Sequence, residues 1–158
     1  MNQISTIMLS LLSIASLSAS AQWTEVEWEQ LDGISNIDFA DDETGYAQMH
    51  LLQGFTSSFE QTEDGGQTWT EMNIPVNSTD IQDMNFYAPG IGAFVARVYV
   101  DGEILTQVYS TNDDGANWEN ISPDEVATGY GMSEIQMLDP NTIFFVIDDY
   151  FYRTINGG

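Results

Sequence analysis

The sequence contains no cysteine and no lysine, and its only arginines are Arg97 and Arg153. Because cysteine is absent, no disulfide framework can hold the fold together, and its stability must come from packing. Against these two arginines stand 25 aspartates and glutamates, which gives a formal net charge of −23. Such a chain lacks the cations that replace counterions around phosphates. The composition therefore argues against binding to nucleic acid and to anionic membranes.

Histidine is almost absent as well. His50 is the single histidine, and one imidazole cannot form a histidine metal cluster or a proton relay. The sequence has no G-x-S-x-G segment, the local motif of one class of serine nucleophile. We interpret His50 as an ordinary strand residue. What remains is globular in composition, because 42% hydrophobic and 12% aromatic residues are too many for a disordered acidic tail.

No charged side chain occurs before Glu25. The apolar run from Ile4 to Leu17 is shorter than the ~20 residues of a membrane-spanning helix. Small residues follow it, with an Ala19-x-Ala21 pattern typical of a cleavage site. A short membrane anchor or a buried strand are the alternatives. We predict a signal peptide over residues 1–21, a secreted or periplasmic protein that begins at residue 22, and no membrane insertion after cleavage.

Residues 62–69 (Thr-Glu-Asp-Gly-Gly-Gln-Thr-Trp) are typical of a tight turn between two strands. The aspartate can accept backbone N–H bonds across the turn, and the glycines can adopt positive φ without a Cβ clash. The pattern recurs at 111–118 (Thr-Asn-Asp-Asp-Gly-Ala-Asn-Trp), and a third copy starts at 154–158 (Thr-Ile-Asn-Gly-Gly). The residues predicted to form these turns, with a structural role, are Thr62, Asp64, Gly65, Gly66, Thr68, Trp69, Thr111, Asp113, Gly115, Trp118, Thr154, Asn156 and Gly158.

This pattern, S/T-x-D-x-G-x-T-W, resembles the Asp-box or BNR repeat of sialidases, sortilin-type receptors, xyloglucanases and photosystem II assembly factors. The first copy fits at every position, the second has Asn117 for threonine, and the third has Asn156 for aspartate. The spacing from Phe39 to Gly45 adds an F-x-x-x-x-x-G signature, which makes the photosystem II assembly factor-like and sortilin-like families the most similar. The resemblance implies a β-propeller in which each Asp-box is a structural turn on the outer side of a blade.

Tryptophan and phenylalanine recur at intervals of about 47 residues, the size of a four-stranded propeller blade. Alternating apolar residues and turn signals divide the chain into units at 34–75, 81–122 and 133–158, the last without a fourth strand. Within these units the strands that we predict include 45–51, 68–74, 117–121, 143–147 and 150–154. Residues 22–31 are a candidate strand that closes the ring. We therefore predict an all-β fold, an incomplete N-terminal fragment of about three antiparallel blades after the signal peptide, with 22–158 as one domain.

Several acidic pairs could in principle serve a glycosidase, which needs two carboxylates about 5–9.5 Å apart. They are Asp41-Asp42-Glu43, Asp113-Asp114, Asp124-Glu125 and Asp148-Asp149. Each lies in a predicted turn or connection, where solvated acids are the ordinary outcome. The resemblance to sialidases would require three arginines around the sugar carboxylate, and this chain has two. A xyloglucanase-type hydrolase remains the alternative function.

The first turn has a spacing of oxygen ligands that is also found in calcium-binding loops. Glu60, Thr62, Asp64, Gly65 and Glu71 have the spacing of EF-hand loop positions 1, 3, 5, 6 and 12. The flanking segments favour strands rather than helices, and Ile121 stands at the last position of the second copy. We predict no cofactor and no dedicated metal site, and weak calcium binding at the acidic turns stays open.

The resemblance implies a non-catalytic platform that binds a protein or an extracellular ligand. The photosystem II assembly factors present a basic arginine patch, which a chain with only two arginines cannot reproduce.

Overall fold

The computed structural model describes residues 31–51, 57–75, 80–123 and 133–158. The predicted signal peptide, nearly all of the candidate closing strand and the Asp124-Glu125 pair lie outside these residues. The described residues form strands and turns, and they include no helix long and apolar enough to cross a membrane.

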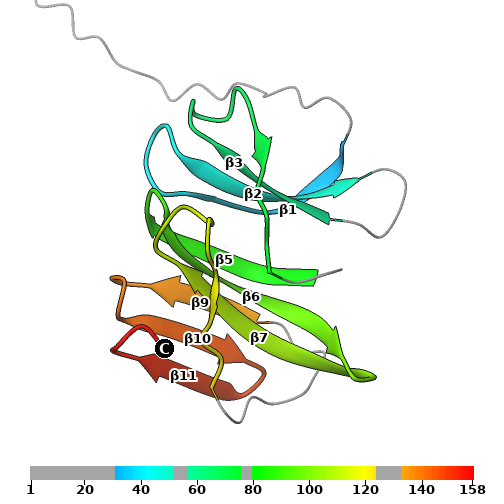
Figure 1. Ribbon diagram of the computed structural model, residues 1–158, viewed down its shortest axis with the longest axis vertical. Coiled ribbons are helices and arrows are strands. Elements are labelled where there is room, and N and C mark those ends of the chain that lie inside the picture. Colours follow the sequence, from blue (N-terminus) through cyan, green and yellow to red (C-terminus); the bar gives the residue numbers. More distant parts are fainter. Residues whose placement is uncertain (1–30, 52–56, 76–79, 124–132) are drawn as a thin grey trace, which may run out of the picture.

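The described strands form three separate antiparallel sheets (Figure 1). The first sheet has the order β1-β2-β3-β4 and the second β5-β6-β7-β8, whereas the third has β11-β10-β9. The strands are β1 (Leu31–Phe39), β2 (Gly45–Leu51), β3 (Ser57–Thr62), β4 (Thr70–Glu71), β5 (Asp80–Ala88), β6 (Ile91–Val100), β7 (Glu103–Thr111), β8 (Glu119–Asn120), β9 (Ser133–Met137), β10 (Ile143–Ile147) and β11 (Tyr150–Thr154).

The sheets follow one another in sequence order and pack face to face (Figure 1). Strand β1 contacts β5, and β5 contacts β9, so the first strands of successive sheets are neighbours. Sequential four-stranded antiparallel sheets stacked in this way are the blades of a β-propeller. The predicted fold class is confirmed: the chain is all-β and forms an incomplete propeller.

The strand register repeats from sheet to sheet. In the first sheet Gly45 lies between Phe39 and Thr62 on the neighbouring strands. The corresponding central residues are Gly92 in the second sheet and Ile143 in the third. A Cβ atom on either glycine would overlap the phenylalanine ring on the adjacent strand. The glycine therefore makes room for the ring.

The outer strands are shorter than the sequence predicts. We expected strands at 68–74 and 117–121, whereas β4 and β8 have two residues each. The residue after each strand still donates one backbone bond inward, from Met72 to Phe59 and from Ile121 to Val108. The residues before each strand belong to the turns, because their backbone N–H groups bind the turn aspartates.

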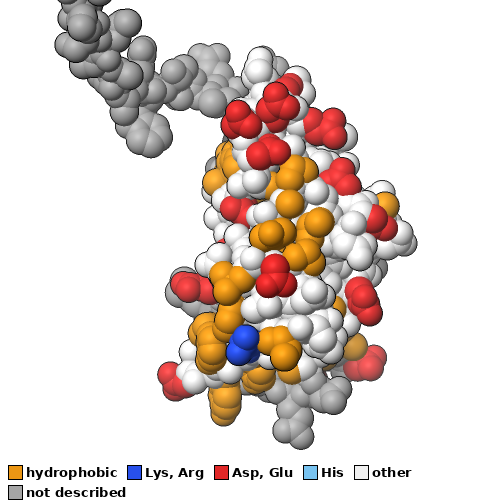
Figure 2. Space-filling model, turned by 90° about the vertical axis from the view of Figure 1, so that its left-hand side faces the viewer, with side chains coloured by type: hydrophobic (Ala, Val, Ile, Leu, Met, Phe, Trp, Pro, Cys, Tyr) orange, Lys and Arg blue, Asp and Glu red, His pale blue; other side chains and the backbone are white. Residues whose placement is uncertain are grey.

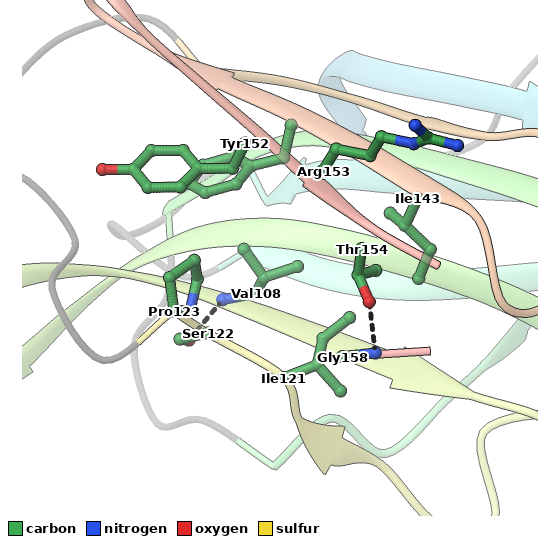
Figure 3. A pocket seen from close by; sticks show the side chains of 10 residues that line it. Val108, Ile121, Ser122, Pro123, Ile143, Tyr152, Arg153, Thr154 and Gly158 are labelled. Carbon is green, nitrogen blue, oxygen red and sulfur yellow. Dashed lines mark hydrogen bonds between the residues drawn. The ribbon is translucent and has the colours of Figure 1, made fainter. Parts of the chain in front are cut away.

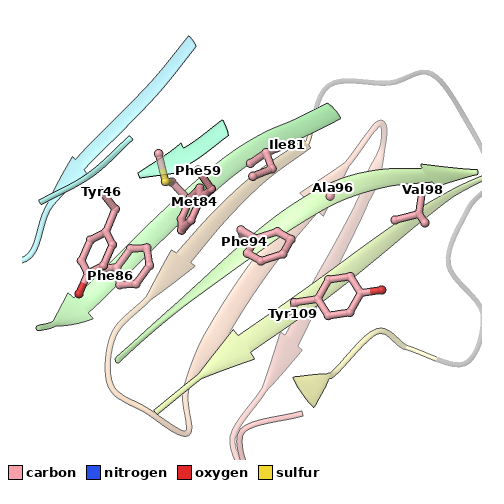
Figure 4. Close-up of a cluster of buried hydrophobic side chains, with 9 residues drawn as sticks. All are labelled: Tyr46, Phe59, Ile81, Met84, Phe86, Phe94, Ala96, Val98 and Tyr109. Atoms are coloured by element: carbon pink, nitrogen blue, oxygen red, sulfur yellow. The ribbon is translucent and has the colours of Figure 1, made fainter. Parts of the chain in front are cut away.

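Two hydrophobic clusters lie between the sheets. The cluster between the first and second sheets is rich in aromatic rings (Figure 4), including a stacked pair of Tyr46 and Phe86 with ring centroids 3.4 Å apart. The cluster between the second and third sheets is mainly aliphatic and contains Val95, Val108 and Phe145. Strands β9 and β10 alternate buried and more exposed residues, as expected for strands with one face in a core.

Candidate functional site

The first predicted turn is held by the hydroxyl of Thr62, which is buried. This hydroxyl donates a hydrogen bond of 2.8 Å to the Asp64 carboxylate and accepts one of 2.9 Å from the backbone N–H of Gly66. Gly65 and Gly66 have φ values of 70° and 89°, in the left-handed region that glycine adopts without strain. The two hydrogen bonds thus link Thr62, at the start of the turn, to Asp64 and Gly66.

The Asp64 carboxylate binds the outgoing half of the turn. It accepts backbone N–H bonds from Gln67 at 2.9 Å and Thr68 at 2.8 Å, and a hydroxyl bond from Thr68 at 2.7 Å. Hydrogen bonds from Thr68 and the other turn donors favour the ionised form and lower the pKa of Asp64 to about 2. This carboxylate is therefore committed to the turn and is poorly suited to proton transfer near neutral pH.

The second turn has the same hydrogen bonds with different donors. Thr111 accepts from the backbone N–H of Gly115 at 3.0 Å and donates to Asp113. Asn117 replaces the threonine of the first copy, and its side-chain amide donates to Asp113 at 2.7 Å. These bonds lower the pKa of Asp113. Asp114 occupies the place of the first glycine, with a φ of 61°.

The third turn keeps the threonine bonds of the other two. Thr154 accepts from the backbone N–H of Gly158 at 3.0 Å and donates to the side-chain oxygen of Asn156 at 2.7 Å. An amide oxygen thus replaces the carboxylate oxygen as acceptor of this threonine bond.

The indole N–H groups of the two turn tryptophans have different hydrogen-bond acceptors. The indole N–H of Trp69 donates to the carbonyl of Gly66 in its own turn, and its ring meets Phe39 edge to face. The indole N–H of Trp118 donates across the sheet interface to the carbonyl of Asn73 at 3.1 Å. The ring of Trp118 therefore links the second sheet to the first.

A second set of polar residues, which we call the inner-strand polar row, stands one and three positions before the phenylalanines on β1 and β5. Its members are Asn36, Asp38, Asp83 and Asn85. The side chain of Asp38 accepts the backbone N–H of Phe86 at 2.6 Å, and the side chain of Asn85 accepts that of Met137 at 2.7 Å.

The other two members of the row also reach the next sheet. Asp83 accepts the backbone N–H of Ile135 at 2.9 Å, and Asn36 donates to the carbonyl of Ile81 at 3.3 Å. Burial raises the pKa of Asp83, and the nearby charges of Glu134 and Asp38 add to that effect. Each member binds backbone of the following sheet, so the inner-strand polar row fixes the relative position of the sheets.

This row is not among the residues predicted from the sequence. Its signal was present, since polar residues stand at the same two offsets before Phe39 and Phe86. The alternation of polar and apolar residues predicts only a half-buried strand, because periodicity does not show what the polar side chains bind. Tyr46 was missed as well: its hydroxyl accepts from the Gly90 N–H at 2.8 Å and donates to Asp114 at 3.1 Å.

The acidic pairs considered for catalysis are dispersed over different turns. Asp41 accepts the backbone N–H groups of Glu43 and Thr44 in the β1–β2 turn, and these bonds lower its pKa. Asp148 and Asp149 form the hairpin between β10 and β11, where Asp148 has a φ of 51°. The structure places these carboxylates as turn residues on strand connections.

The residues with calcium-loop spacing are spread over the first turn and two strands. Thr62, Asp64 and Gly65 lie in the turn, whereas Glu60 and Glu71 face each other in the β3–β4 register. Within the part of the chain that the structure describes, no three acidic, histidine or cysteine side chains are grouped as metal ligands. The geometry supports turn formation as the main role of these residues.

Solved structures with similar folds were found, whereas comparison with curated protein sequences gave no match. A YCF48 structure bound to a D1 peptide is 20% identical with a TM-score of 0.63, covering 84% of this chain and 40% of that chain. YCF48 from Cyanidioschyzon merolae is 22% identical with a TM-score of 0.59, covering 87% of this chain and 38% of that chain. The chain thus spans about two fifths of the length of these structures.

A GH74 xyloglucanase from Xanthomonas campestris is also similar, at 14% identity and a TM-score of 0.58, with 78% of this chain and 21% of that chain covered. At these identities the structural likeness shows the fold alone. The family relationship is shown by the sequence. The family model described as photosynthesis system II assembly factor YCF48 matches residues 15–158, and the chain belongs to this family.

Proposed function

We propose that this protein is an exported, non-catalytic propeller that acts as a binding platform for a polypeptide partner. The observation that carries the proposal is the use of its carboxylates. Asp64 and Asp113 accept hydrogen bonds within their turns, and Asp38 and Asp83 accept backbone N–H groups of the following sheet. These groups hold the frame together, so they support a rigid scaffold rather than acid–base chemistry.

The charge of the chain bears on the kind of partner. Figure 2 shows acidic side chains distributed over one face, with hydrophobic side chains gathered among them. The exposed aromatic residues include Tyr99, Tyr150 and Phe151, which are 67%, 58% and 67% exposed. Exposed aromatic side chains on a chain with a net charge of −23 favour a polypeptide with basic and apolar residues, because the field attracts cations and the rings supply contact area.

Family membership supports a polypeptide as the ligand class to test. One YCF48 structure contains a D1 peptide, although its identity to this chain is too low to transfer that ligand. The likeness to a GH74 xyloglucanase shows only that the two folds are similar. The hydrolase alternative therefore becomes an outcome of the same experiment.

The test is selection of a displayed random peptide library on the folded chain, with counter-selection on the chain held in urea. We expect enriched peptides rich in basic and aromatic residues, with affinity that falls as salt is raised because salt screens charge. The same protein is incubated with xyloglucan. Release of reducing ends would contradict the platform, as would a selection that enriches nothing on the folded chain.

Export is tested separately. The apolar run and the Ala19-x-Ala21 pattern predict cleavage after residue 21. Mass spectrometry of the protein expressed with an export pathway should give Gln22, or its cyclised form, at the amino terminus. A mature protein that retains residues 1–21 would contradict export by cleavage.

A further inference from the structure

The β6–β7 hairpin of the second sheet is longer than the β10–β11 hairpin of the third. The pairing of β6 with β7 contains nine residue pairs and ends at Val100 opposite Glu103. The pairing of β10 with β11 contains five and ends at Ile147 opposite Tyr150. Both pairings begin at the threonine of an Asp-box turn, so the β6–β7 hairpin extends four pairs further, or about 13 Å. Figure 1 shows it reaching past the turn between β10 and β11.

A tight turn closes this projecting hairpin. Asp101 and Gly102 connect the two strands with φ values of 52° and 93°. Positive φ at both central residues is the requirement of the type I′ turn, whose twist matches that of the strands it joins. The nine pairs are also consecutive, without a register shift. The projecting part is therefore ordered before any partner arrives, which lowers the entropy cost of binding.

The projecting part carries apolar side chains on the side of the third sheet. Val95 belongs to the cluster between the second and third sheets, and Tyr99, four positions later on the same strand, points to the same side. Ile104 is paired with Tyr99 and shares this side. Among the described residues, the β10–β11 pairing ends at Ile147, the equivalent of Ala96, so Tyr99 lies three residues beyond it. The ring of Tyr99 is 67% exposed and Ile104 is half-buried. We call this pair the hairpin face.

The charges along the hairpin are unevenly placed. Asp101 and Glu103, at the end of the hairpin, are exposed and acidic. Arg97 lies on the side of the hairpin face, two positions before Tyr99 and closer to the body of the sheet. A cationic group of a ligand is therefore favoured at the end of the hairpin and disfavoured beside Arg97.

We propose that the hairpin face binds an extended segment of a partner polypeptide in which apolar side chains are followed by arginine or lysine. The apolar side chains cover Tyr99 and Ile104, and the cation lies beside Tyr99 and the carboxylate of Asp101. This inference rests on the proposed function, since it concerns the same class of partner. It adds the surface that the partner contacts and the order of residue types along the bound segment.

The hairpin face is separate from a pocket of about 390 Å³ between the same two sheets (Figure 3). That pocket is lined by Val108, Phe145 and Ser122, among others, whereas Tyr99 and Ile104 do not line it. A substitution at Tyr99 therefore leaves the walls of the pocket unchanged.

The probe is a labelled synthetic peptide, acetyl-Leu-Thr-Trp-Thr-Arg-Arg-amide. Its leucine and tryptophan lie on one side of an extended strand. Binding to the full chain is measured by fluorescence anisotropy, and we expect saturation with an affinity that falls as salt is raised. A control peptide with serine in place of leucine and tryptophan keeps the charge and should bind at least about tenfold more weakly.

Two tyrosines of the second sheet give a matched pair of protein variants. Tyr99→Ser removes the ring from the hairpin face. Tyr87→Ser is the control, because Tyr87 is 48% exposed and follows Phe86, whose partner Gly92 is at the opposite end of the sheet. We expect Tyr99→Ser to weaken binding of the probe at least about tenfold and Tyr87→Ser to leave it nearly unchanged. Both variants are first checked for folding by circular dichroism.

A third variant tests the position of the cation. Asp101→Asn removes the charge and keeps a residue type that tolerates the φ of 52°. We expect it to weaken binding of the probe about two- to fivefold, the range of an exposed charge pair, and to reduce the dependence on salt. An affinity unchanged by Asp101→Asn would contradict the placement of the cation at the turn.

Several results would overturn the proposal. They are absence of binding at about 1 mM peptide, equal affinity for the serine peptide, and equal loss of binding in both tyrosine variants. Xyloglucan oligosaccharides that bind the wild type but not Tyr99→Ser would assign the hairpin face to a carbohydrate instead. Library peptides that bind the folded chain and are unaffected by Tyr99→Ser would support the platform and contradict the hairpin face, so the two proposals can fail separately.

Discussion

The carboxylate of Asp38 accepts a hydrogen bond of 2.6 Å from the backbone N–H of Phe86, 48 residues further along the chain. Asn85 makes the equivalent bond to Met137, 52 residues further along. Asp38 immediately precedes Phe39, and Phe86 is the equivalent of Phe39 in the next sheet. In each case the polar residue therefore accepts the backbone N–H of the residue that is equivalent to its own apolar neighbour. Because these bonds join residues about one repeat apart in the sequence, they fix the position of each sheet relative to the next.

Asp38→Ala is expected to lower the free energy of unfolding by about 1–3 kcal/mol, because it leaves the Phe86 N–H without its acceptor. Asp38→Asn is the matched control, since an amide oxygen performs this role at Asn85. Urea unfolding followed by tryptophan fluorescence measures both. Equal stability of the two variants would show that this hydrogen bond contributes little.

Thr62→Val keeps the size of a buried side chain and removes its hydroxyl. The Gly66 N–H then loses its acceptor in a buried position, so we expect a loss of about 1–3 kcal/mol in unfolding free energy. Thr62→Ser retains the hydroxyl and should lose clearly less. A serine variant as unstable as the valine variant would show that the methyl group, rather than the hydrogen bond, is important.

The first turn should give the protein an acid-sensitive stability. The pKa of Asp64 is about 2 in the folded chain, below the ordinary aspartate value of 3.8, so folding favours its ionised form. The contribution is fully present above pH 3.8 and is lost as the pH falls through about 2. Acid unfolding of the wild type and Asp64→Asn should therefore converge over this range. Parallel curves would contradict the assignment.

Gly92→Ala should be destabilising by about 1–3 kcal/mol, because the added Cβ overlaps the ring of Phe86. The third sheet suggests the rescue: there Ile143 lies opposite Met137 on the neighbouring strand. The double variant Gly92→Ala with Phe86→Met should recover part of the loss in thermal unfolding. A double variant whose losses simply add would rule out the steric explanation.

Tyr46 should titrate apart from solvent-exposed phenols, which ordinarily ionise near pH 10. Burial raises the pKa of Tyr46 to about 12, and the charge of Asp114 adds to this. Ultraviolet titrations of the wild type and Tyr46→Phe should therefore differ by one phenol, and only above about pH 10. Because folding raises the pKa of Tyr46, the protonated phenol contributes stability. That contribution is fully present below about pH 10 and is lost as the pH rises through about 12. A difference that appears already below this range would contradict the burial of the phenol.

The turns and the strands beside them could be predicted from the sequence because their causes are local. The strands Gly45–Leu51, Ile143–Ile147 and Tyr150–Thr154 have the predicted bounds. Each is bounded by glycine, asparagine or aspartate residues that favour turns. The all-β fold follows from the same repeated pattern together with the family resemblance.

The sequence pattern also has limits within single strands. Residues 34–39 alternate polar and apolar side chains, yet Ile34, Ile37 and Phe39 are 42%, 53% and 41% exposed. Two facts explain this. The register shifts between Ile34 and Asn36, and it does so again at the equivalent place between Ile81 and Asp83. Asn36 and Asp38 also bind the backbone of the second sheet, so the residues that alternate with them, Ile37 and Phe39, lie on the opposite face of β1.

By itself, the sequence determined the repeat, the turn residues and the strong negative charge, since each is a property of neighbouring residues or of composition. Only the tertiary structure decided that Asp38, Asp83 and Asn85 bind the next sheet and that Val108, Phe145 and Ser122 surround one pocket. These groups are brought together by the stacking of sheets about 50 residues apart in the chain. Their contacts depend on the register and the distance between sheets, which no local pattern of residues specifies.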